Sequence, residues 1–551
     1  MEKLWVNQYP QGVPADIDLN RITSVADFLL EACQEFASKT AYISMGKSIT
    51  YQQLNDQSRI FAQHLQSIGV RKGDRVALMM PNVLQYPITL FGTLRAGAVV
   101  VNCNPLYTPR ELEHQLTDSG ATVIVILENF AHTLEQVIGK TQVRHVIVTP
   151  LGEMLGAKGH IVNFVVRKIK KLVPAWNLPQ AISLNQALAS GNGKPFSKPQ
   201  LTPDDVAFLQ YTGGTTGISK GAILTHRNIC ANVLQAEAWI KPVVRRGEEF
   251  IITALPLYHI FALTANCLTF LRIGAQNLLI ANPRDIPNFV KEWAKYPVTV
   301  FTAVNTLFNA LLNNPDFLKL NFSTMRVTLG GGMAVQRPVA ERWRSVTGCA
   351  LSQAYGLTET SPAATINPLI DIPFSGSIGL PISSTEVSIR DDQGAALPLG
   401  EVGEICIRGP QVTPGYWGRP DETAKIFFPD GFLKTGDMGY VDPQGYVFLV
   451  DRKKDMILVS GFNVYPNEVE EVVAMHPAVR EVAAIGVADE NTGEAVKLFV
   501  ATSDPSLTKE AIIEHCKEYL TNYKVPKQIE FRPELPKTNV GKILRRALRD
   551  G

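Results

Sequence analysis

The chain has 551 residues, of which 45% are hydrophobic and 19% are charged. This length exceeds what one hydrophobic core supports, and the composition is that of a soluble globular protein. The 53 Lys and Arg against 51 Asp and Glu give a net charge of +2, which argues against nucleic acid as a partner.

The seven cysteines are spread along the chain and include no Cys-x-x-Cys pair. Their odd number and wide spacing argue against a disulfide framework and against a zinc site. The first twenty residues lack the apolar core of a signal peptide. We therefore expect a protein of the reducing cytoplasm.

Residues 1 to about 150 alternate between strand-like and helix-like segments. The expected elements are a hairpin around Gly46, a helix over 51–65, a strand over 75–80, a helix over 83–94 and apolar strands at 98–101 and 122–127. This alternation of strands and helices predicts a parallel, doubly wound α/β sheet.

Residues 161–173 carry the pattern of a basic amphipathic helix. Apolar residues at 162, 165, 166, 169, 172 and 173 share one helical face, and four basic residues lie beside them: Arg167, Lys168, Lys170 and Lys171. With Trp176 close by, segment 161–176 can lie on an anionic inner membrane surface, which would make the protein peripheral to that membrane. A surface helix packed on its own domain explains the pattern equally well, so both interpretations stay open.

A loop rich in glycine and threonine separates two predicted strands at 206–210 and 222–226. Its sequence is Tyr211-Thr212-Gly213-Gly214-Thr215-Thr216-Gly217-Ile218-Ser219-Lys220-Gly221. Glycines let backbone N–H groups approach an anion, Thr hydroxyls add donors, and the lysine adds a full positive charge. The spacing differs from the common P-loop, in which Gly-Lys-Ser/Thr directly precedes a helix. We interpret the loop as a polyphosphate site rather than a flexible surface hairpin.

Residues 254–271 contain no formal charge and reach the length of a membrane-spanning helix. Pro256 and several polar residues interrupt the stretch, so we expect a buried strand–loop–helix of a large domain instead. His259 lies in this apolar setting, where a histidine is as often a core residue as a functional one.

Three later segments carry groups that suit a nucleotide. The backbone of Gly330–Gly332 can lie flat against a planar ring. Tyr355 offers a ring for stacking, and Glu359 offers a carboxylate of the kind that Mg²⁺ takes together with phosphate oxygens. Asp437 is suited to hold two ribose hydroxyls, although an Asp after Gly is often only a turn former.

The pattern changes towards the C-terminus. Short segments separated by Gly, Pro and Asp predict an antiparallel barrel or small sheet at about 386–450. The charge run 451–455 suits a linker, and the last hundred residues predict a small α+β domain. We expect a large domain over 1–451, which includes the β-barrel subdomain, and a small mobile domain over 452–551. Lys542 follows a glycine there and can reach the site of another domain.

Together these segments resemble the adenylate-forming enzymes, which include acyl-CoA synthetases, peptide-synthetase adenylation domains and firefly luciferase. The likeness covers essentially the whole chain and rests on five motifs in the order of that superfamily, at 211–221, 355–359, 435–437, 451–455 and 536–542. Within the superfamily, the segments 78–82, 101–111 and 459–466 resemble bacterial long-chain fatty-acid–CoA ligases.

The resemblance implies a two-step reaction. A fatty-acid carboxylate attacks the α-phosphate of ATP, which gives acyl-adenylate and pyrophosphate, and the thiol of coenzyme A then displaces AMP. Mg²⁺ is the implied metal. Two like charges about 4 Å apart repel by roughly 4 kcal/mol at an effective dielectric near 20. Cations aimed at the developing charge are therefore the expected catalytic device.

The resemblance also implies roles for single residues in the first step. Lys542 would bridge the carboxylate and the α-phosphate, Thr358 would contact the α-phosphate, and Glu359 would bind Mg²⁺. His259 would border the acyl and thiol path, and Leu263 is the expected acyl-pocket residue. The implied ATP-binding residues are Thr212, Gly213, Gly214, Thr215, Thr216, Gly217, Lys220, Gly331, Gly332, Tyr355, Gly356, Asp437 and Arg452.

Between the two steps the superfamily rotates its small domain, which withdraws the lysine and presents the opposite face for thioester formation. Gly461, Phe462 and Asn463 would line the channel for coenzyme A. Lys454 occupies the hinge position, where many relatives have Asp.

Two other functions stay open. An acyl-AMP ligase would pass its product to a carrier protein, and a non-catalytic, membrane-associated lipid-binding protein would keep only a vestigial ATP site. The joint presence of Lys220, Glu359 and Lys542 argues against the second. No motif encodes the length of the fatty acid, because contacts shape a pocket.

Overall fold

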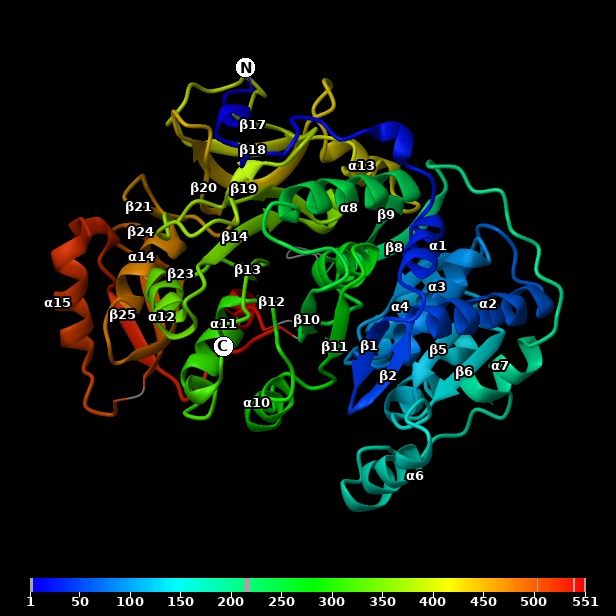
Figure 1. Ribbon diagram of the computed structural model, residues 1–551. Helices are drawn as coiled ribbons and strands as arrows, with labels where there is room; N and C mark the ends of the chain where they lie inside the picture. The colour runs from blue at the N-terminus through cyan, green and yellow to red at the C-terminus, as the bar shows by residue number, and fades with distance from the viewer. Residues whose placement is uncertain (1–2, 213–218, 503, 539–540, 550–551) are drawn as a thin grey trace.

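The structure of the protein, a computed structural model, describes residues 3–212, 219–502, 504–538 and 541–549. These residues form four β-sheets with helices packed against them (Figure 1). Two large sheets build the body of the molecule, a smaller sheet lies next to them, and the fourth sheet belongs to the C-terminal part at the left of the figure. The expected large α/β part and small C-terminal part are confirmed.

The first large sheet has the strand order β7-β6-β5-β3-β4-β8-β9. Its strands are β3 (Arg75–Met79), β4 (Val99–Asn102), β5 (Val123–Leu127), β6 (His145–Thr149), β7 (Ile182–Ser183), β8 (Val206–Thr212) and β9 (Lys220–Thr225). Neighbouring strands run parallel except β8 and β9. Helices α2 (Tyr51–Ser67) and α3 (Gln85–Arg95) cover one face, and α4 (Pro109–Ser119) and α5 (Ala131–Glu135) cover the other. Strand β5 is buried at every position because both faces are covered.

The second large sheet has the order β16-β15-β14-β13-β12-β10-β11-β1-β2. Its strands are β1 (Thr40–Ser44), β2 (Lys47–Thr50), β10 (Phe250–Thr253), β11 (Gln276–Leu279), β12 (Val300–Ala303), β13 (Val327–Gly330), β14 (Leu351–Gly356), β15 (Ala363–Ile366) and β16 (Leu380–Pro381). Helices α10 (Ile286–Trp293), α11 (Asn305–Leu312) and α12 (Arg337–Thr347) cover one face. Aromatic rings fill this layer, as where Phe301 stacks on Trp343 with 5.9 Å between ring centroids.

One hydrophobic core joins the two large sheets. It contains residues of α1 (Val25–Glu35), α2, α3, α8 (His226–Ile240) and the segment 255–271. The expected hairpin around Gly46 and the helix that follows it are confirmed by β1, β2 and α2.

The uncharged stretch 254–271 is buried, as expected. Strand β10 ends just before it, a loop follows, and a π-helix at Ala262–Thr269 continues into α9 (Phe270–Arg272). Across the described ranges, no helix combines the length and the apolar character needed to cross a membrane.

The β-rich segment forms an antiparallel sheet of β17 (Glu386–Arg390), β18 (Gly403–Arg408), β19 (Leu433–Val441) and β20 (Val447–Arg452). The sequence pattern predicted either an antiparallel barrel or a small sheet, and this sheet corresponds to the second alternative. The C-terminal part has its own sheet and core, built from β21 (Ile457–Val459), β22 (Phe462–Val464), β23 (Val479–Asp489), β24 (Gly493–Thr502), β25 (Gln528–Phe531), α14 (Pro466–Ala474) and α15 (Lys509–Tyr519). The exact division of the chain at 451 and 452 stays a prediction.

The expected amphipathic helix at 161–173 has a different shape. Helix α6 spans Ala157–Phe164, and a π-helical turn follows at Val165–Ile169. A π-helical turn departs from the 3.6-residue period, so the six apolar positions do not share one face. Val166 is buried, whereas Ile169 and Leu172 are 64% and 54% exposed. Figure 1 shows α6 at the lower edge, away from the sheets.

Candidate functional site

A cavity of about 1700 Å³ lies at the carboxyl ends of β12, β13 and β14, between the large sheets and the C-terminal part. Ligands of open α/β sheets bind at such carboxyl ends. The predicted site residues that line it are Thr212, Lys220, His259, Gly331, Gly332, Tyr355, Gly356, Thr358, Glu359, Asp437, Arg452, Lys454 and Lys542. Residues that are up to 330 positions apart in the sequence therefore share one cavity.

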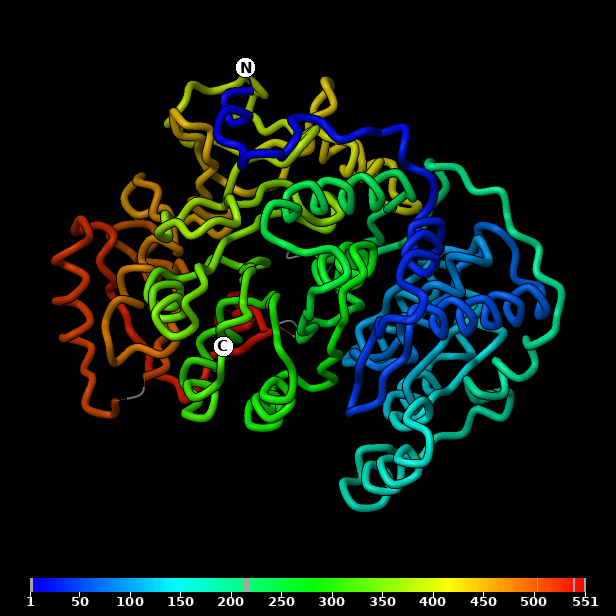
Figure 2. Tube along the Cα trace, in the orientation of Figure 1, coloured from blue at the N-terminus to red at the C-terminus, as the bar shows by residue number. Residues whose placement is uncertain are grey.

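Lys542 enters this cavity from the C-terminal part. Figure 2 shows the red C-terminal segment returning to the green region of α11 and β12. The hydroxyl of Thr306, in α11, donates a hydrogen bond of 2.8 Å to the carbonyl of Gly541. Burial and the nearby Arg452 lower the pKa of Lys542 to about 8, although Asp437 acts in the opposite direction. Burial disfavours the charged form of this lysine, and an anion bound in the cavity would stabilise its ammonium group.

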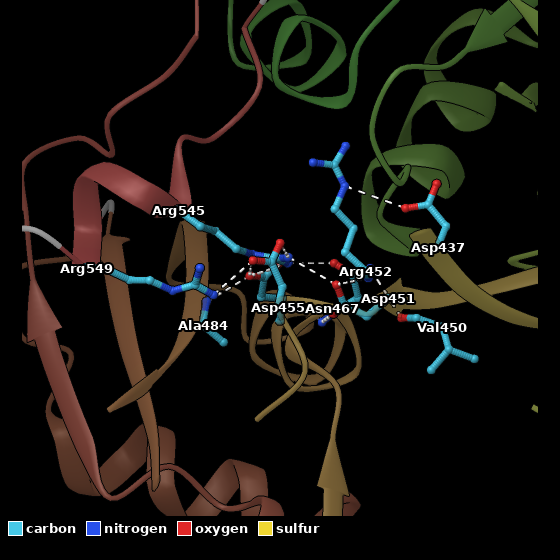
Figure 3. A network of polar contacts seen from close by, with 10 residues as sticks. Asp437, Val450, Asp451, Arg452, Asp455, Asn467, Ala484, Arg545 and Arg549 are labelled. Atoms are coloured by element: carbon cyan, nitrogen blue, oxygen red, sulfur yellow. Dashed lines mark hydrogen bonds and ion pairs between the residues drawn. The ribbon is translucent and has the colours of Figure 1, made fainter. Parts of the chain in front are cut away.

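Asp437 and Tyr355 meet beside Arg452. The Tyr355 hydroxyl donates to Oδ2 of Asp437 at 2.6 Å, and Nε of Arg452 lies 3.6 Å from Oδ1. Asp437 and Arg452 are paired residues of the β19–β20 ladder, which fixes their separation (Figure 3). Burial raises the pKa of Asp437, and the neighbouring Arg452 and Tyr355 oppose that rise. The arrangement provides a hydrogen-bond acceptor and a cation on one edge of the cavity.

His259 is a neutral member of the site. Burial and the positive charge of Lys542 lower the pKa of its imidazole to about 3. Its Nδ1 accepts a hydrogen bond of 3.4 Å from the N–H of Phe261, which leaves the ring proton on Nε2. The ring can therefore donate one hydrogen bond at neutral pH but carries no charge.

Glu359 and Lys220 share one partner, Tyr416. The Tyr416 hydroxyl donates to Oε1 of Glu359 at 2.5 Å, and the Lys220 ammonium lies 5.4 Å from the centre of the Tyr416 ring. Lys220 also forms an ion pair with Glu422, which pairs in turn with Lys425 at 2.6 Å. A phosphate that binds Lys220 would have to replace Glu422.

Two glycines permit close approach in the cavity. A Cβ at Gly356 would lie 1.7 Å from the carbonyl oxygen of Pro362, so no larger residue fits. Gly332 has a φ of +79°, and a Cβ there would lie 3.2 Å from Cε of Lys542. The flat glycine backbone that the sequence predicted thus lies directly against the lysine.

The other predicted residues fall into three groups. Gly213, Gly214, Thr215, Thr216 and Gly217 are outside the described residues. Gly461, Phe462 and Asn463 are not among the residues that line the cavity, and Phe462 is 57% exposed and stacks on Tyr523. Leu263 is fully buried in the core between the sheets, while the next two residues of the same π-helix, Thr264 and Ala265, line the cavity.

Ion pairs anchor the chain on both sides of Lys454. Lys453 pairs with Asp392 at 2.5 Å and with Glu404 at 3.3 Å, both in the β-rich part. Asp455 pairs with Arg549 of α16 (Arg545–Arg549) at 2.9 Å. Lys454 lines the cavity, where partial burial of its ammonium group and the nearby Arg452 lower its pKa.

A buried network connects β20 with the C-terminal part (Figure 3). Arg545 donates to Oδ1 of Asp451 at 3.2 Å, to Oδ1 of Asn467 at 2.6 Å and to both carboxylate oxygens of Glu470 at 2.8 Å. Burial raises the pKa of Asp451 and of Glu470, and Arg545 opposes both shifts. Asp451 is the partner in β20, whereas Asn467 and Glu470 belong to α14, so the network ties the segment that carries Lys542 to α14 and to the end of β20.

Beyond the polar part, the cavity continues as an apolar tunnel between α8, the π-helix and the second large sheet. The residues that line the tunnel include Ala236, Ile240, Ala265, Phe270, Leu329 and Ile366. Three polar residues in its walls satisfy their hydrogen bonds within the protein. Asn232 exchanges two hydrogen bonds with the backbone of Ala363, at 2.8 and 3.0 Å. The hydroxyls of Thr264 and Thr302 donate to Ser361 and Asn266.

Sequence reasoning missed Tyr416, Glu422 and the Arg545 network. Tyr416 lies in a loop between β18 and β19, and Glu422 lies in the short helix α13 (Pro420–Lys425) that follows it; no spacing or composition marks either residue as part of a site. Arg545 follows Lys542 closely, so the segment was recognised, but its partners Asp451 and Glu470 could be found only from the fold.

The AMP-binding enzyme family matches residues 29–417, and its C-terminal domain matches residues 468–542. The chain belongs to the AMP-binding enzyme family. The expected resemblance to adenylate-forming enzymes is therefore confirmed, and with it an enzyme for which ATP is a substrate.

Relatives within the family extend over the whole chain. A long-chain-fatty-acid–CoA ligase of Escherichia coli O6:H1 is 58% identical, over 100% of this chain and 98% of its own length. Its counterpart in Yersinia pestis is 59% identical with the same coverage. The long-chain-fatty-acid–CoA ligase of Bacillus subtilis is 36% identical over 99% of this chain and 98% of its own.

Solved structures of AMP-binding enzymes share the fold. The anthranilate CoA ligase AuaEII, in complex with anthranoyl-AMP, is 27% identical and gives a TM-score of 0.86, over 97% of this chain and 98% of its own. MatB from Rhodopseudomonas palustris is 28% identical over 95% of this chain and 98% of its own. The TM-score is 0.82 with its ATP-bound structure and 0.74 with its apo structure, so the present arrangement is closer to the ATP-bound one.

Proposed function

We propose that this enzyme is an AMP-forming long-chain fatty-acid–CoA ligase. The observation that carries the proposal is the position of Lys542, which lies beside Gly332 in a cavity that both polar and apolar residues line. A fatty-acid carboxylate at the tunnel mouth and the α-phosphate of ATP would both reach it. The identity of 58% to a long-chain-fatty-acid–CoA ligase along the full chain supports the same substrate class.

The tunnel suits a hydrocarbon chain. Asn232, Thr264 and Thr302 direct their hydrogen bonds into the protein, and apolar side chains such as Ile240, Phe270 and Leu329 line the tunnel beside them. Burying apolar surface contributes about 25 cal/mol per Å². A long acyl chain therefore binds here much more tightly than a short one.

In the first step, positive charge must offset the repulsion between carboxylate and triphosphate. Lys542 and Arg452 supply it at the α-phosphate end, and Lys220 at the β- and γ-phosphate end, with Thr212 and Thr358 as donors. Asp437 would accept hydrogen bonds from the ribose hydroxyls once its hydrogen bond with Tyr355 is broken. Gly331, Gly332 and Tyr355 would enclose the adenine. Pyrophosphate leaves as the new acyl–phosphate bond forms at the α-phosphorus.

Glu359 fits the one carboxylate that Mg²⁺ needs beside phosphate oxygens. Tyr416 orients its carboxylate by a hydrogen bond to Oε1. Within the described ranges no three His, Cys, Asp or Glu side chains form a metal cluster, which suits an ion held mainly by substrate. When bound, Mg²⁺ would neutralise phosphate charge. The residues named above would orient the substrates.

For the second step we propose a rotation about Lys454. Its neighbours are anchored to different parts of the protein, so the turn at 453–455 is the place where the backbone can change direction. Gly461, Phe462 and Asn463 are exposed on the C-terminal part and would reach the cavity only after that rotation. There they would line the path of the coenzyme A thiol.

We further propose that α6 and the segment after it contact an anionic membrane surface. Four large apolar side chains are exposed within twelve residues: Ile161 (67%), Phe164 (59%), Ile169 (64%) and Leu172 (54%). Arg167 pairs with Glu128, whereas Lys168, Lys170 and Lys171 are exposed beside the apolar group. Apolar side chains flanked by lysines favour an anionic bilayer over a neutral protein surface.

The function is tested by following AMP release with ATP and a C14 fatty acid, with and without coenzyme A. A ligase accelerates AMP release when coenzyme A is added and accumulates acyl-CoA. If coenzyme A has no effect and acyl-adenylate accumulates, the enzyme is an acyl-AMP ligase that serves a carrier protein. If no fatty acid supports pyrophosphate release, the protein has no ligase activity.

A further inference from the structure

The far end of the apolar tunnel lies at the amino-terminal edge of the second large sheet. Val300 and Val327, the first residues of β12 and β13, line it there, and Gly331 lines it at the carboxyl end. The tunnel therefore follows β13 along its whole length. At about 3.3 Å per residue, the four steps from Gly331 to Val327 span about 13 Å.

A second hollow of about 120 Å³ lies beyond this end, in the same direction. Val327 and Leu369 line both the tunnel and the hollow. Leu329 of β13 pairs with Ser352 of β14, so their side chains lie on the same face of the sheet. On this face Leu329 and Ala354 line the tunnel, and Ser352 and Ala350 line the hollow. The side chains of Val327 and Leu369 therefore lie between the two spaces.

We propose that Leu369, together with Val327, forms the floor that sets the length of the acyl chain. Leu369 is 9% exposed and Val327 is 3% exposed, so both are held in place by packing. The proposal rests on the proposed ligase function, for which it names the residues that determine chain-length specificity.

The dimensions fix the expected substrate. An extended chain advances about 3.5 Å for three bonds, or about 1.2 Å per bond. The 13 Å of tunnel then hold about eleven bonds beyond Gly331, and the carboxyl end adds the few atoms that reach Lys542. The floor should therefore favour fatty acids of about 14 carbons and disfavour those of 18.

Removal of the floor side chain should join the two spaces. A volume of 120 Å³ compares with the roughly 30 Å³ that one water molecule occupies in the liquid, so the hollow holds several methylene groups. Ile370, the neighbouring residue, lines the hollow but not the tunnel and is 49% exposed. It offers a matched control, because its truncation leaves the floor intact.

The test compares kcat/KM for C10, C14, C18 and C20 fatty acids in wild type, Leu369→Ala, Val327→Ala and Ile370→Ala. Leu369→Ala should raise the ratio of C18 to C14 about 10-fold, which is typical of one or two accommodated methylenes in a hydrophobic pocket. Val327→Ala should shift the ratio the same way, and Ile370→Ala should leave it unchanged.

An unchanged ratio in both floor variants would overturn the proposal, as would an equal shift in Ile370→Ala. Val327→Ala keeps the test valid if Leu369→Ala fails to fold. The outcome is separable from that of the ligase function. Wild-type protein that activates no fatty acid contradicts the function itself, whereas active protein with an unshifted profile contradicts only the floor.

Discussion

Lys542 lies against Gly332, so closely that a Cβ at position 332 would be 3.2 Å from Cε of the lysine. One residue belongs to the loop after β13 and the other to the C-terminal part, which approaches the sheet in this orientation. The contact is therefore a marker of the inserted state. In this state the ammonium group is withdrawn from bulk water. Its charge therefore acts more strongly on a bound anion than it would in water.

We expect Lys542→Ala to lower the rate of acyl-adenylate formation by about 100-fold or more, as when one preorganised donor to a transition state is lost. Thioester formation from supplied acyl-adenylate should stay within a few-fold of wild type. Pyrophosphate exchange and a coenzyme A assay with synthetic acyl-adenylate separate the steps. Lys517→Ala, an exposed lysine of α15, is the control. Equal loss in both half-reactions would contradict a role limited to the first step.

The pH dependence follows from the lowered pKa of Lys542. Since its pKa in the free enzyme is about 8, the lysine loses its proton as the pH rises through 8, and kcat/KM for adenylation should fall there. In Lys542→Arg the fall should be absent, because a guanidinium stays charged. Initial rates between pH 6.5 and 9.5 give the profile. A wild-type profile that is flat up to pH 9.5 would refute a charged-lysine requirement.

Glu359→Gln should weaken the response to Mg²⁺ while leaving the hydrogen bond from Tyr416 possible. We expect the Mg²⁺ concentration for half-maximal adenylation to rise about 10-fold. Glu422→Gln is the informative companion, because it releases Lys220 from an ion pair and should not weaken the Mg²⁺ response. If the two variants respond alike to Mg²⁺, Glu359 is not the ligand.

Arg545 stabilises buried carboxylates, so Arg545→Met should cost about 3 kcal/mol of folding free energy. Burial already raises the pKa of Asp451 and Glu470, and loss of the cation should raise both further. The folded variant then binds more protons than the unfolded chain, and its stability should rise as the pH falls from 7 towards 5. Arg532→Met, which removes a half-exposed pair with Glu530, should cost no more than about 1 kcal/mol.

For the membrane contact, we compare wild type with a variant in which Lys168, Lys170 and Lys171 are replaced by Gln and another in which Ile161 and Phe164 are replaced by Ser. Both should lose most of their co-sedimentation with vesicles that contain anionic lipid, and wild-type binding should weaken as salt rises. Vesicles of neutral lipid serve as the control. Binding that neither variant reduces would place the contact elsewhere.

Much of the architecture was predictable because it depends on local patterns. Apolar runs such as β5 and the helix period of 51–65 depend on which side chains must be buried, and a sequence displays that directly. The segment 161–173 was predicted less well, since a π-helical turn at Val165–Ile169 moves residues off the face that a regular helix would give them.

The site was predictable only where its residues lie in compact motifs. Lys542, Asp437 and Tyr355 were found in that way, and the fold brings them to one cavity. Leu263 illustrates the limit, because residues of one helix point either to the core or to the tunnel, and the sequence does not say which. The partners of Arg545 and the position of Tyr416 depend on long-range packing, which no local pattern encodes.

The hydrogen bonds that Asn232, Thr264 and Thr302 make within the protein have a consequence for recognition. At these three residues an acyl chain meets no donor that needs a partner, so they do not distinguish one methylene position from the next. A hydroxyl group on the chain beside the apolar residues of the tunnel would be buried unpaired, at a cost of about 1–3 kcal/mol. The enzyme would then select fatty acids by chain length and disfavour chains that carry a hydroxyl group, without recognising any single methylene position.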